Sequence, residues 1–187
     1  MIGFKKKSEG DKENPIEPEI IDRIKIIDEL SGLPKSHFDQ FYKEPIERFT
    51  LLTRHCKCER VVAHLDKVIH SLRLRRSIVL PLASDAESIN AQKDIWTYAI
   101  FVASMTFRVS ELLSYHVLLG RDGQRNNTRW CPFDEPFDTS LDVLDEQRVE
   151  LTPHADLLFL SRLFSRTNLI WLYRNPEAFN ATLLLSV

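Results

Sequence analysis

The sequence predicts a mostly α-helical fold that carries one small β-hairpin insertion. In most of the chain, apolar residues recur every three or four positions, which is the spacing of a helix with one buried face. The segment 120–123 instead has the composition of a hairpin turn between two extended stretches. The length of 187 residues and the 43% hydrophobic content predict a single core. We expect one domain at residues 15–187, preceded by a flexible tail at residues 1–14.

The first half of the chain predicts three amphipathic segments. The first begins at Pro18 and ends at Gly32, a residue type that commonly caps helix C-termini. The second begins near Ser36 and is kinked or ended by Pro45, after which its apolar stripe continues. The third is a helix at 59–76 with its apolar residues on one face.

The second half predicts a central helix, the hairpin and several short helices. Residues 87–115 include a stretch that is apolar on nearly every side, as expected for a helix packed among others. The hairpin strands are expected at 116–119 and 128–130. Residues 133–150 are acidic and predict a long solvent-facing loop. The closing helices are expected from Thr152 and Pro153 onward, at 169–173 and at 176–185.

The charge and cysteine content exclude several classes of protein. The chain has 25 Lys and Arg residues against 27 Asp and Glu residues, so it is not basic as a whole, unlike the simplest nucleic-acid-binding proteins. Three cysteines are too few for the disulfide framework of a small secreted protein and favour a reducing compartment. The most apolar window, 96–105, has about half of the roughly 20 residues that span a bilayer. Because the N-terminus also lacks a signal-peptide pattern, we expect a cytoplasmic protein without a membrane segment.

Positive charge is concentrated in and just before the helix at 59–76. Between positions 54 and 76 seven residues are basic and two are acidic. Clustered cations bind phosphate backbones by releasing counterions, so this segment is a candidate DNA contact. A face that only contacts water is the alternative. The seven basic residues are Arg54, Lys57, Arg60, Lys67, Arg73, Arg75 and Arg76.

The run His-Cys-Lys-Cys at 55–58 contains residue types that bind zinc. A zinc site needs about four nitrogen or sulfur ligands, so Cys131, His64 or His154 would have to join the run. Free, partly buried thiols and a packed, hydrogen-bonded His64 are the alternatives. The sequence contains no P-loop, dinucleotide-binding fingerprint, serine nucleophile elbow or zinc-protease helix, and we predict no catalytic residue.

Several stretches, taken in order, resemble one known family. Their order and spacing are similar to those of the N-terminal HD-type domain of TraI-like conjugative relaxases, the MobH class, over about residues 30–187. The stretches are His64–Arg76, Leu80-Pro81, Trp96–Ser104, Arg129–Pro132, His154–Phe164, Leu169–Leu172 and Asn175–Glu177.

The resemblance implies an HD-like helical bundle in which histidines and an adjacent His-Asp pair hold a divalent metal ion for phosphodiester chemistry. At the family's ligand positions this chain has His55, His64 and His154, and it has Thr106 and Phe107 in place of the His-Asp pair. Threonine is a poor metal ligand and phenylalanine has no charge, so the resemblance implies a degenerate metal site. The neighbouring Arg108 would disfavour a dication further if its side chain pointed inward.

These features predict a non-catalytic relaxase-like protein of conjugative DNA transfer or of integrating conjugative elements. It would act as a DNA- or protein-interaction module without a cofactor. One alternative is a metal-dependent phosphodiesterase or relaxase that uses a divalent ion at a site rebuilt from His55, His64, His154 and the cysteines. Another is a domain that packs against other conjugation proteins or against a C-terminal relaxase domain.

Overall fold

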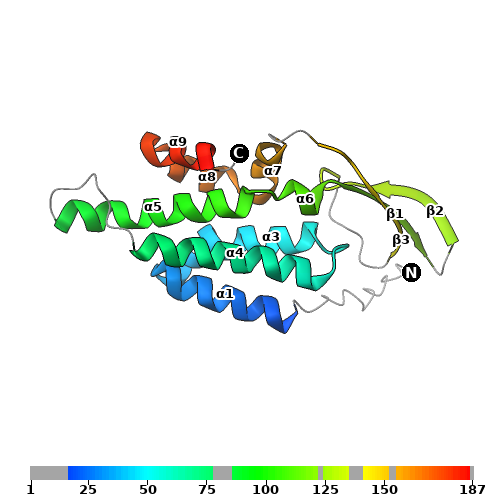
Figure 1. Cartoon of the computed structure of the whole chain (residues 1–187), viewed down its shortest axis with the longest axis horizontal. Coiled ribbons are helices and arrows are strands. Elements are labelled where there is room, and N and C mark those ends of the chain that lie inside the picture. The colour runs from blue at the N-terminus through cyan, green and yellow to red at the C-terminus, as the bar shows by residue number, and fades with distance from the viewer. Residues whose placement is uncertain (1–16, 78–85, 122–123, 135–140, 152–154, 186–187) are drawn as a thin grey trace, which may run out of the picture.

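The computed structural model describes residues 17–77, 86–121, 124–134, 141–151 and 155–185 (Figure 1). Within these ranges the fold is mostly α-helical with one small antiparallel sheet, which confirms the predicted fold class. The helices form one body, and the sheet projects from one end of it (Figure 1). The predicted tail at 1–14 lies outside the described residues.

The N-terminal helices follow the predicted segments closely. Gly32 caps the first helix with a left-handed φ of 66°, as its residue type predicts. Pro45 lies in the first turn of a helix, where its missing N–H is not needed, and a π-helical turn directly before it absorbs the change in the chain. The elements are α1 (Pro18–Ser31), α2 (Lys35–Phe38), η1 (Asp39–Lys43), α3 (Glu44–Leu52) and α4 (Cys58–Ser77).

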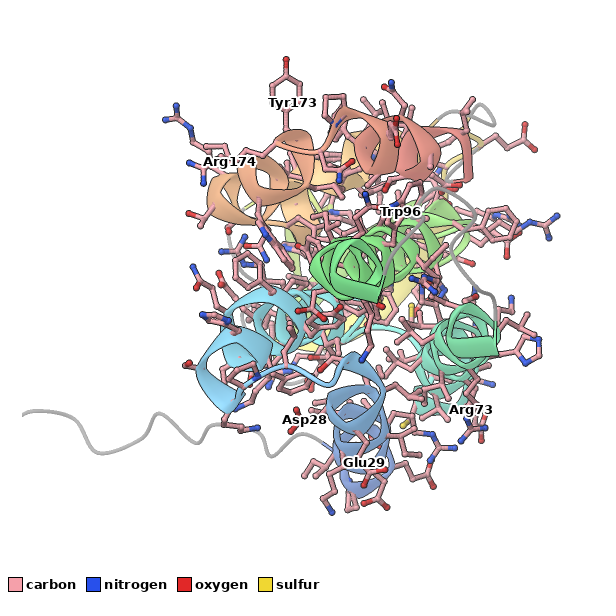
Figure 2. The ribbon with its side chains drawn as sticks, turned by 90° about the vertical axis from the view of Figure 1, so that its left-hand side faces the viewer. Asp28, Glu29, Arg73, Trp96, Tyr173 and Arg174 are labelled. Carbon is pink, nitrogen blue, oxygen red and sulfur yellow. The ribbon has the colours of Figure 1, made fainter. Side chains whose placement is uncertain are left out.

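Helix α5 (Ala86–Thr106) is the central helix of the fold. Figure 2 shows it between α3 and α4 on one side and the C-terminal helices on the other. The Phe101 ring of α5 is fully buried and lies 4.5 Å from the Tyr42 ring and 6.0 Å from the Phe164 ring. α5 therefore connects the N-terminal and C-terminal parts of one core.

The prediction that this helix continues to residue 115 is wrong. α5 ends at Thr106, and the short helix α6 (Ser110–Leu113) follows after a turn in which Arg108 has a φ of 55°. A left-handed residue cannot continue an α-helix, so the chain changes direction there. The sequence does not indicate this break, because arginine seldom adopts a positive φ.

The predicted hairpin is part of a three-stranded antiparallel sheet with the order β2-β1-β3. Its strands are β1 (Tyr115–Arg121), β2 (Gln124–Trp130) and β3 (Asp142–Arg148). The prediction of a continuous loop at 133–150 is therefore wrong for residues 142–148, which form β3. β3 is an edge strand that is exposed along most of its length, so its acidic sequence lacks the alternation of a half-buried strand. Backbone pairing with β1 determines its structure.

The C-terminal helices pack on the side of α5 that faces away from α4. They are α7 (Asp156–Leu163), α8 (Arg166–Tyr173) and α9 (Pro176–Leu185). Ser165 caps α8 by accepting a hydrogen bond from the Asn168 N–H, so this helix begins before the predicted position 169. The predicted helix start at Thr152 and Pro153 lies outside the described residues. Among the helices that the structure describes, none is both long and apolar enough to cross a membrane.

Candidate functional site

His64, on α4, is a packed residue that binds the end of α5. Its side chain is buried, and its Nε2–H donates to the Met105 carbonyl oxygen at 3.0 Å. Its ring lies 4.9 Å from the Phe49 ring. Burial is the main cause that lowers the pKa of His64, so the neutral imidazole is favoured. Because the last carbonyl groups of a helix lack intrahelical partners, His64 satisfies one such group from the neighbouring helix.

Thr106 and Phe107, at the positions where the resemblance expects a His-Asp pair, have different surroundings. Thr106 is fully buried, and its hydroxyl donates to the Val102 carbonyl oxygen at 2.8 Å. Phe107 is 40% exposed and does not fill the space beside His64. Arg108 also points outward, where its guanidinium lies 3.6 Å from the Glu111 carboxylate. Because this side chain does not point inward, Arg108 adds no charge to the interior.

His55 belongs to a separate cluster at the base of the sheet. Its ring centroid lies 5.7 Å from that of Tyr115 and 5.8 Å from that of Trp130. The Cys56 Sγ lies 3.4 Å from His55 Nε2 and 3.5 Å from the Leu112 carbonyl oxygen. Burial lowers the pKa of His55 and raises the pKa of Cys56 to about 11, so both groups are neutral at neutral pH.

As the structure describes them, the residues at the positions where the resemblance expects ligands do not form a metal-binding group. The Nε2 of His64 and the hydroxyl of Thr106 are already hydrogen-bonded to backbone carbonyl groups, and Phe107 offers no ligand atom. Within the described ranges, no group of three or more His, Cys, Asp or Glu side chains is arranged to hold a metal. His154 lies outside the described residues.

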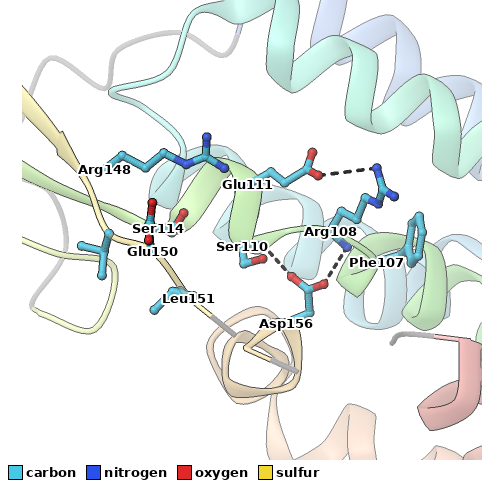
Figure 3. A pocket seen from close by; sticks show the side chains of 10 residues that line it. Phe107, Arg108, Ser110, Glu111, Ser114, Arg148, Glu150, Leu151 and Asp156 are labelled. Atoms are coloured by element: carbon cyan, nitrogen blue, oxygen red, sulfur yellow. Dashed lines mark hydrogen bonds and ion pairs between the residues drawn. The ribbon is translucent and has the colours of Figure 1, made fainter. Parts of the chain in front are cut away.

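Asp156, a residue that sequence reasoning missed, fastens the turn between α5 and α6. Its buried carboxylate accepts one hydrogen bond from the Arg108 N–H at 2.9 Å and another from the Ser110 N–H at 2.7 Å (Figure 3). The two N–H groups thus bind an anion supplied by α7. An acidic residue in the first turn of a helix is a common pattern, and nothing in the sequence links position 156 to a turn almost 50 residues earlier.

An open groove of about 760 Å³ lies beside this anchored turn. Phe107, Arg108 and Glu111 line it from the turn and α6, and Arg148 and Glu150 line it from β3 and the residues that follow (Figure 3). The groove contains both positive and negative side chains, and the charges of Arg108 and Glu111 offset each other. It therefore has no single-sign field that would select a charged ligand.

The left-handed backbone at Arg108 leads to a prediction that distinguishes it from ordinary helical positions. We expect Arg108→Gly to be more stable than Arg108→Ala by about 1 kcal/mol, because only glycine adopts a positive φ without a steric penalty. Inside a helix the order would be reversed. Urea denaturation of the two variants measures the difference, and both variants lack the Glu111 ion pair equally. An Arg108→Ala variant at least as stable as Arg108→Gly would contradict the geometry of this turn.

The seven basic residues of the predicted DNA contact do not share one surface. Arg75 is 9% exposed, so it is not available to a ligand on the surface. Arg54 is half-buried, and the side chain of Arg76 lies outside the described set. Arg60 is exposed, but its guanidinium donates to the Glu111 carbonyl oxygen at 2.9 Å and lies 3.5 Å from the Tyr115 hydroxyl. The remaining members are exposed: Lys67 and Arg73 lie on α4 and Lys57 lies directly before it. These three residues are called the α4 cations below.

Comparison with family models, with curated proteins and with solved structures finds no match to this chain. The resemblance to HD-type relaxase domains accordingly stays a prediction from the sequence.

Proposed function

We propose that this protein is a non-catalytic relaxase-like protein of conjugative DNA transfer that binds DNA through the α4 cations. Two independent considerations support the proposal. The first is the resemblance of the sequence to HD-type relaxase domains, together with the loss of the His-Asp pair at Thr106 and Phe107. The second is the state of charge on the surface of α4.

The observation that carries the proposal is that the α4 cations are exposed and have no acidic partner among the described ion pairs. The nearby acid Asp66 is bound instead by Arg23 of α1, at 3.1 Å. Unpaired cations can neutralise DNA phosphates, and the release of the counterions condensed on the DNA favours binding. Figure 2 shows Arg73 at the outer side of α4.

The remaining charges near α4 are consistent with this role. Arg60 and Lys67 are seven residues apart, which is about 10 Å and two turns along a helix, so they lie on the same face. The guanidinium of Arg60 is held by neutral groups and keeps its full positive charge. Glu59 is the second acid of this segment, and it leaves an excess of positive charge on the exposed surface.

A charge-neutralising variant tests the proposal. We expect Lys57→Gln/Lys67→Gln/Arg73→Gln to bind a short labelled duplex at least about 10-fold more weakly at low salt, because each lost phosphate contact removes one site of counterion release. In fluorescence anisotropy across about 50 to 200 mM salt, the slope of log affinity against log salt should fall by about 2 to 3. Arg60 is left unchanged because its hydrogen bonds stabilise the fold.

A matched control removes three positive charges elsewhere. Lys25, Lys35 and Lys43 are exposed or half-buried lysines on α1, α2 and η1, and each lies within 3.5 Å of an acidic side chain. We expect Lys25→Gln/Lys35→Gln/Lys43→Gln to bind DNA nearly as tightly as the unchanged protein. Equal losses in the two triple variants would mean that only net charge matters, and an unchanged protein without salt-dependent binding would refute the proposal.

A further inference from the structure

The outer side of α8 combines two arginines with two large apolar side chains. Tyr173 is 68% exposed and Ile170 is 41% exposed, and Arg166 and Arg174 are exposed as well. Their spacing of i, i+4, i+7 and i+8 places them on one side of the helix, since Arg174 keeps helical backbone angles at the C-cap. Figure 2 shows Tyr173 and Arg174 pointing away from the body of the molecule. These four residues are called the α8 face below.

The opposite side of α8 is packed against the rest of the fold. Leu172 is buried, and the fully buried Asn168 donates from its side-chain amide to the Gln40 carbonyl oxygen at 3.1 Å. The Trp171 ring lies 4.7 Å from the Tyr98 ring of α5. Because these contacts fix the rotation of the helix about its axis, the α8 face cannot turn inward, and its exposure is a property of the fold.

The Tyr173 ring is held in one orientation although it is exposed. It makes an edge-to-face contact with the Phe179 ring of α9, with ring centroids 5.3 Å apart and an interplanar angle of 84°. A ring that is already oriented loses little conformational freedom when a partner binds. Tyrosine and arginine are also enriched at protein interfaces and among the residues that contribute most to binding. The α8 face therefore has the residue types of a protein-binding surface.

The charge of the α8 face is positive. Neither Arg166 nor Arg174 has an acidic partner among the ion pairs of the described residues. Eight positions separate the two arginines, which is about 12 Å along a helix. A complementary partner must therefore present negative charge at two points about 12 Å apart, with apolar groups between them for Ile170 and Tyr173.

Double-stranded DNA does not match this arrangement. Polar and charged side chains make the contacts that proteins form with phosphates. A row of phosphates along α8 would leave the exposed Ile170, which lies between the arginines, without an apolar group to contact. The α4 cations also lie on the other side of α5 from α8, in both Figure 1 and Figure 2. The α8 face is therefore separate from the proposed DNA contact.

An acidic amphipathic helix matches the arrangement. Two acidic residues eight positions apart on such a helix are also about 12 Å apart, and they lie on nearly the same side. Apolar residues four and seven positions after the first acid lie on that side between them. When this helix lies along α8, one carboxylate can reach each arginine, and the apolar residues can cover Ile170 and Tyr173.

We propose that the α8 face binds an acidic amphipathic helix of a partner protein. The two arginines select the negative charge, and Ile170 and Tyr173 supply the apolar contact that excludes water. This role goes beyond the proposed DNA contact and does not depend on it, because the two surfaces lie on different sides of α5.

Selection from a displayed library of helical peptides, about 16 residues long and randomised on one face, tests the proposal. We expect the full chain to enrich peptides with two acidic residues seven or eight positions apart and apolar residues between them. Ile170→Ser/Tyr173→Ala should bind an enriched, labelled peptide at least about 10-fold more weakly, because such side chains contribute most of the affinity of an interface. Fluorescence anisotropy measures the affinity, and circular dichroism and thermal unfolding check that each variant is folded.

A charge exchange tests the role of the arginines separately. Arg166→Glu/Arg174→Glu should bind the enriched peptide at least about 10-fold more weakly, since like charges then face each other. The same variant should bind a second peptide, in which lysine replaces the two acids, at least about 10-fold more tightly than the unchanged protein does. A structural effect of the two substitutions would not produce this gain.

A matched control changes two exposed apolar residues on other helices. Ile21 of α1 is 41% exposed and Leu158 of α7 is 60% exposed, so Ile21→Ser/Leu158→Ala removes a similar exposed surface. This variant should bind the enriched peptide as tightly as the unchanged protein does. The triple variant of the α4 cations should also keep its affinity for the peptide.

Four outcomes would overturn the proposal. They are enrichment of no peptide, enrichment of basic peptides, peptide binding that Ile170→Ser/Tyr173→Ala leaves unchanged, and the absence of a gain in the charge exchange. Light scattering and anisotropy with a labelled duplex examine two other occupants of the α8 face. Self-association that is lost in Ile170→Ser/Tyr173→Ala would assign the face to a second copy of the chain, and DNA binding that is lost in this variant would assign it to DNA. Either result would replace the partner helix.

Discussion

The variant Asp156→Asn is expected to lower the free energy of unfolding by about 2 to 3 kcal/mol. The carboxylate of Asp156 accepts hydrogen bonds from two backbone N–H groups, those of Arg108 and Ser110, and it is only 5% exposed. An asparagine side chain has one acceptor oxygen and an NH₂ group, so one N–H would face another donor instead of an acceptor. A buried donor without a partner carries the full cost of its desolvation.

The effect should extend beyond the hydrogen bonds themselves. The backbone of Arg108 is left-handed, a conformation that a non-glycine residue adopts only where its surroundings stabilise it. Since Asp156 supplies this stabilisation, the variant should also loosen the connection between α5 and α6. Hydrogen exchange should then increase at positions 108–114 while the amides in the middle of α5 stay protected.

A matched substitution in the same groove serves as the control for Asp156→Asn. Glu150 also lines the groove but is exposed, so Glu150→Gln should change stability by less than about 0.5 kcal/mol. Urea denaturation of the two variants provides the comparison. A loss below about 1 kcal/mol in Asp156→Asn would show that the turn does not depend on this carboxylate.

The elements predicted correctly from the sequence are those whose signal is local. Gly32 ends α1 because its left-handed conformation is available to glycine at no steric cost, and the apolar spacing of α4 is visible in its own residues. The elements that were missed depend on partners far away in the chain. β3 exists because β1 offers it unpaired backbone groups, and the turn at Arg108 exists because Asp156 binds it.

The candidate site divides in the same way. The sequence left two alternatives for His64, a metal ligand or a packed residue, and the hydrogen bond to Met105 favours the packed residue. For Arg75 the residue type indicated a surface cation, whereas the structure buries it, because the helix turns this position toward the core. Composition identifies which charges are present, and only the packing of the helices determines which of them reach the solvent.

Replacement of His64 by leucine should destabilise the protein by about 1 to 3 kcal/mol at about pH 7.5, since the Met105 carbonyl oxygen would remain buried without its partner. Urea denaturation of the variant and of the unchanged protein measures this loss. His70→Leu is the control, because His70 is exposed on the same helix and its replacement should change stability by less than about 0.5 kcal/mol.

The loss caused by His64→Leu should become smaller as the pH falls. Burial lowers the pKa of His64 in the folded protein, whereas the pKa of histidine in an unfolded chain is about 6.5. Below that pH the unfolded chain binds a proton at this position more readily than the folded protein does. The stabilisation associated with neutral His64 is therefore complete above about pH 6.5, and it decreases as the pH falls toward the pKa of His64 in the folded protein. The leucine variant lacks this contribution and retains only the similar one from His55, whose pKa burial also lowers. The difference in the free energy of unfolding between the two proteins should therefore become smaller from about pH 7.5 to about pH 5.5. A difference that stays constant or grows would mean that His64 is protonated as readily in the folded protein as in the unfolded chain.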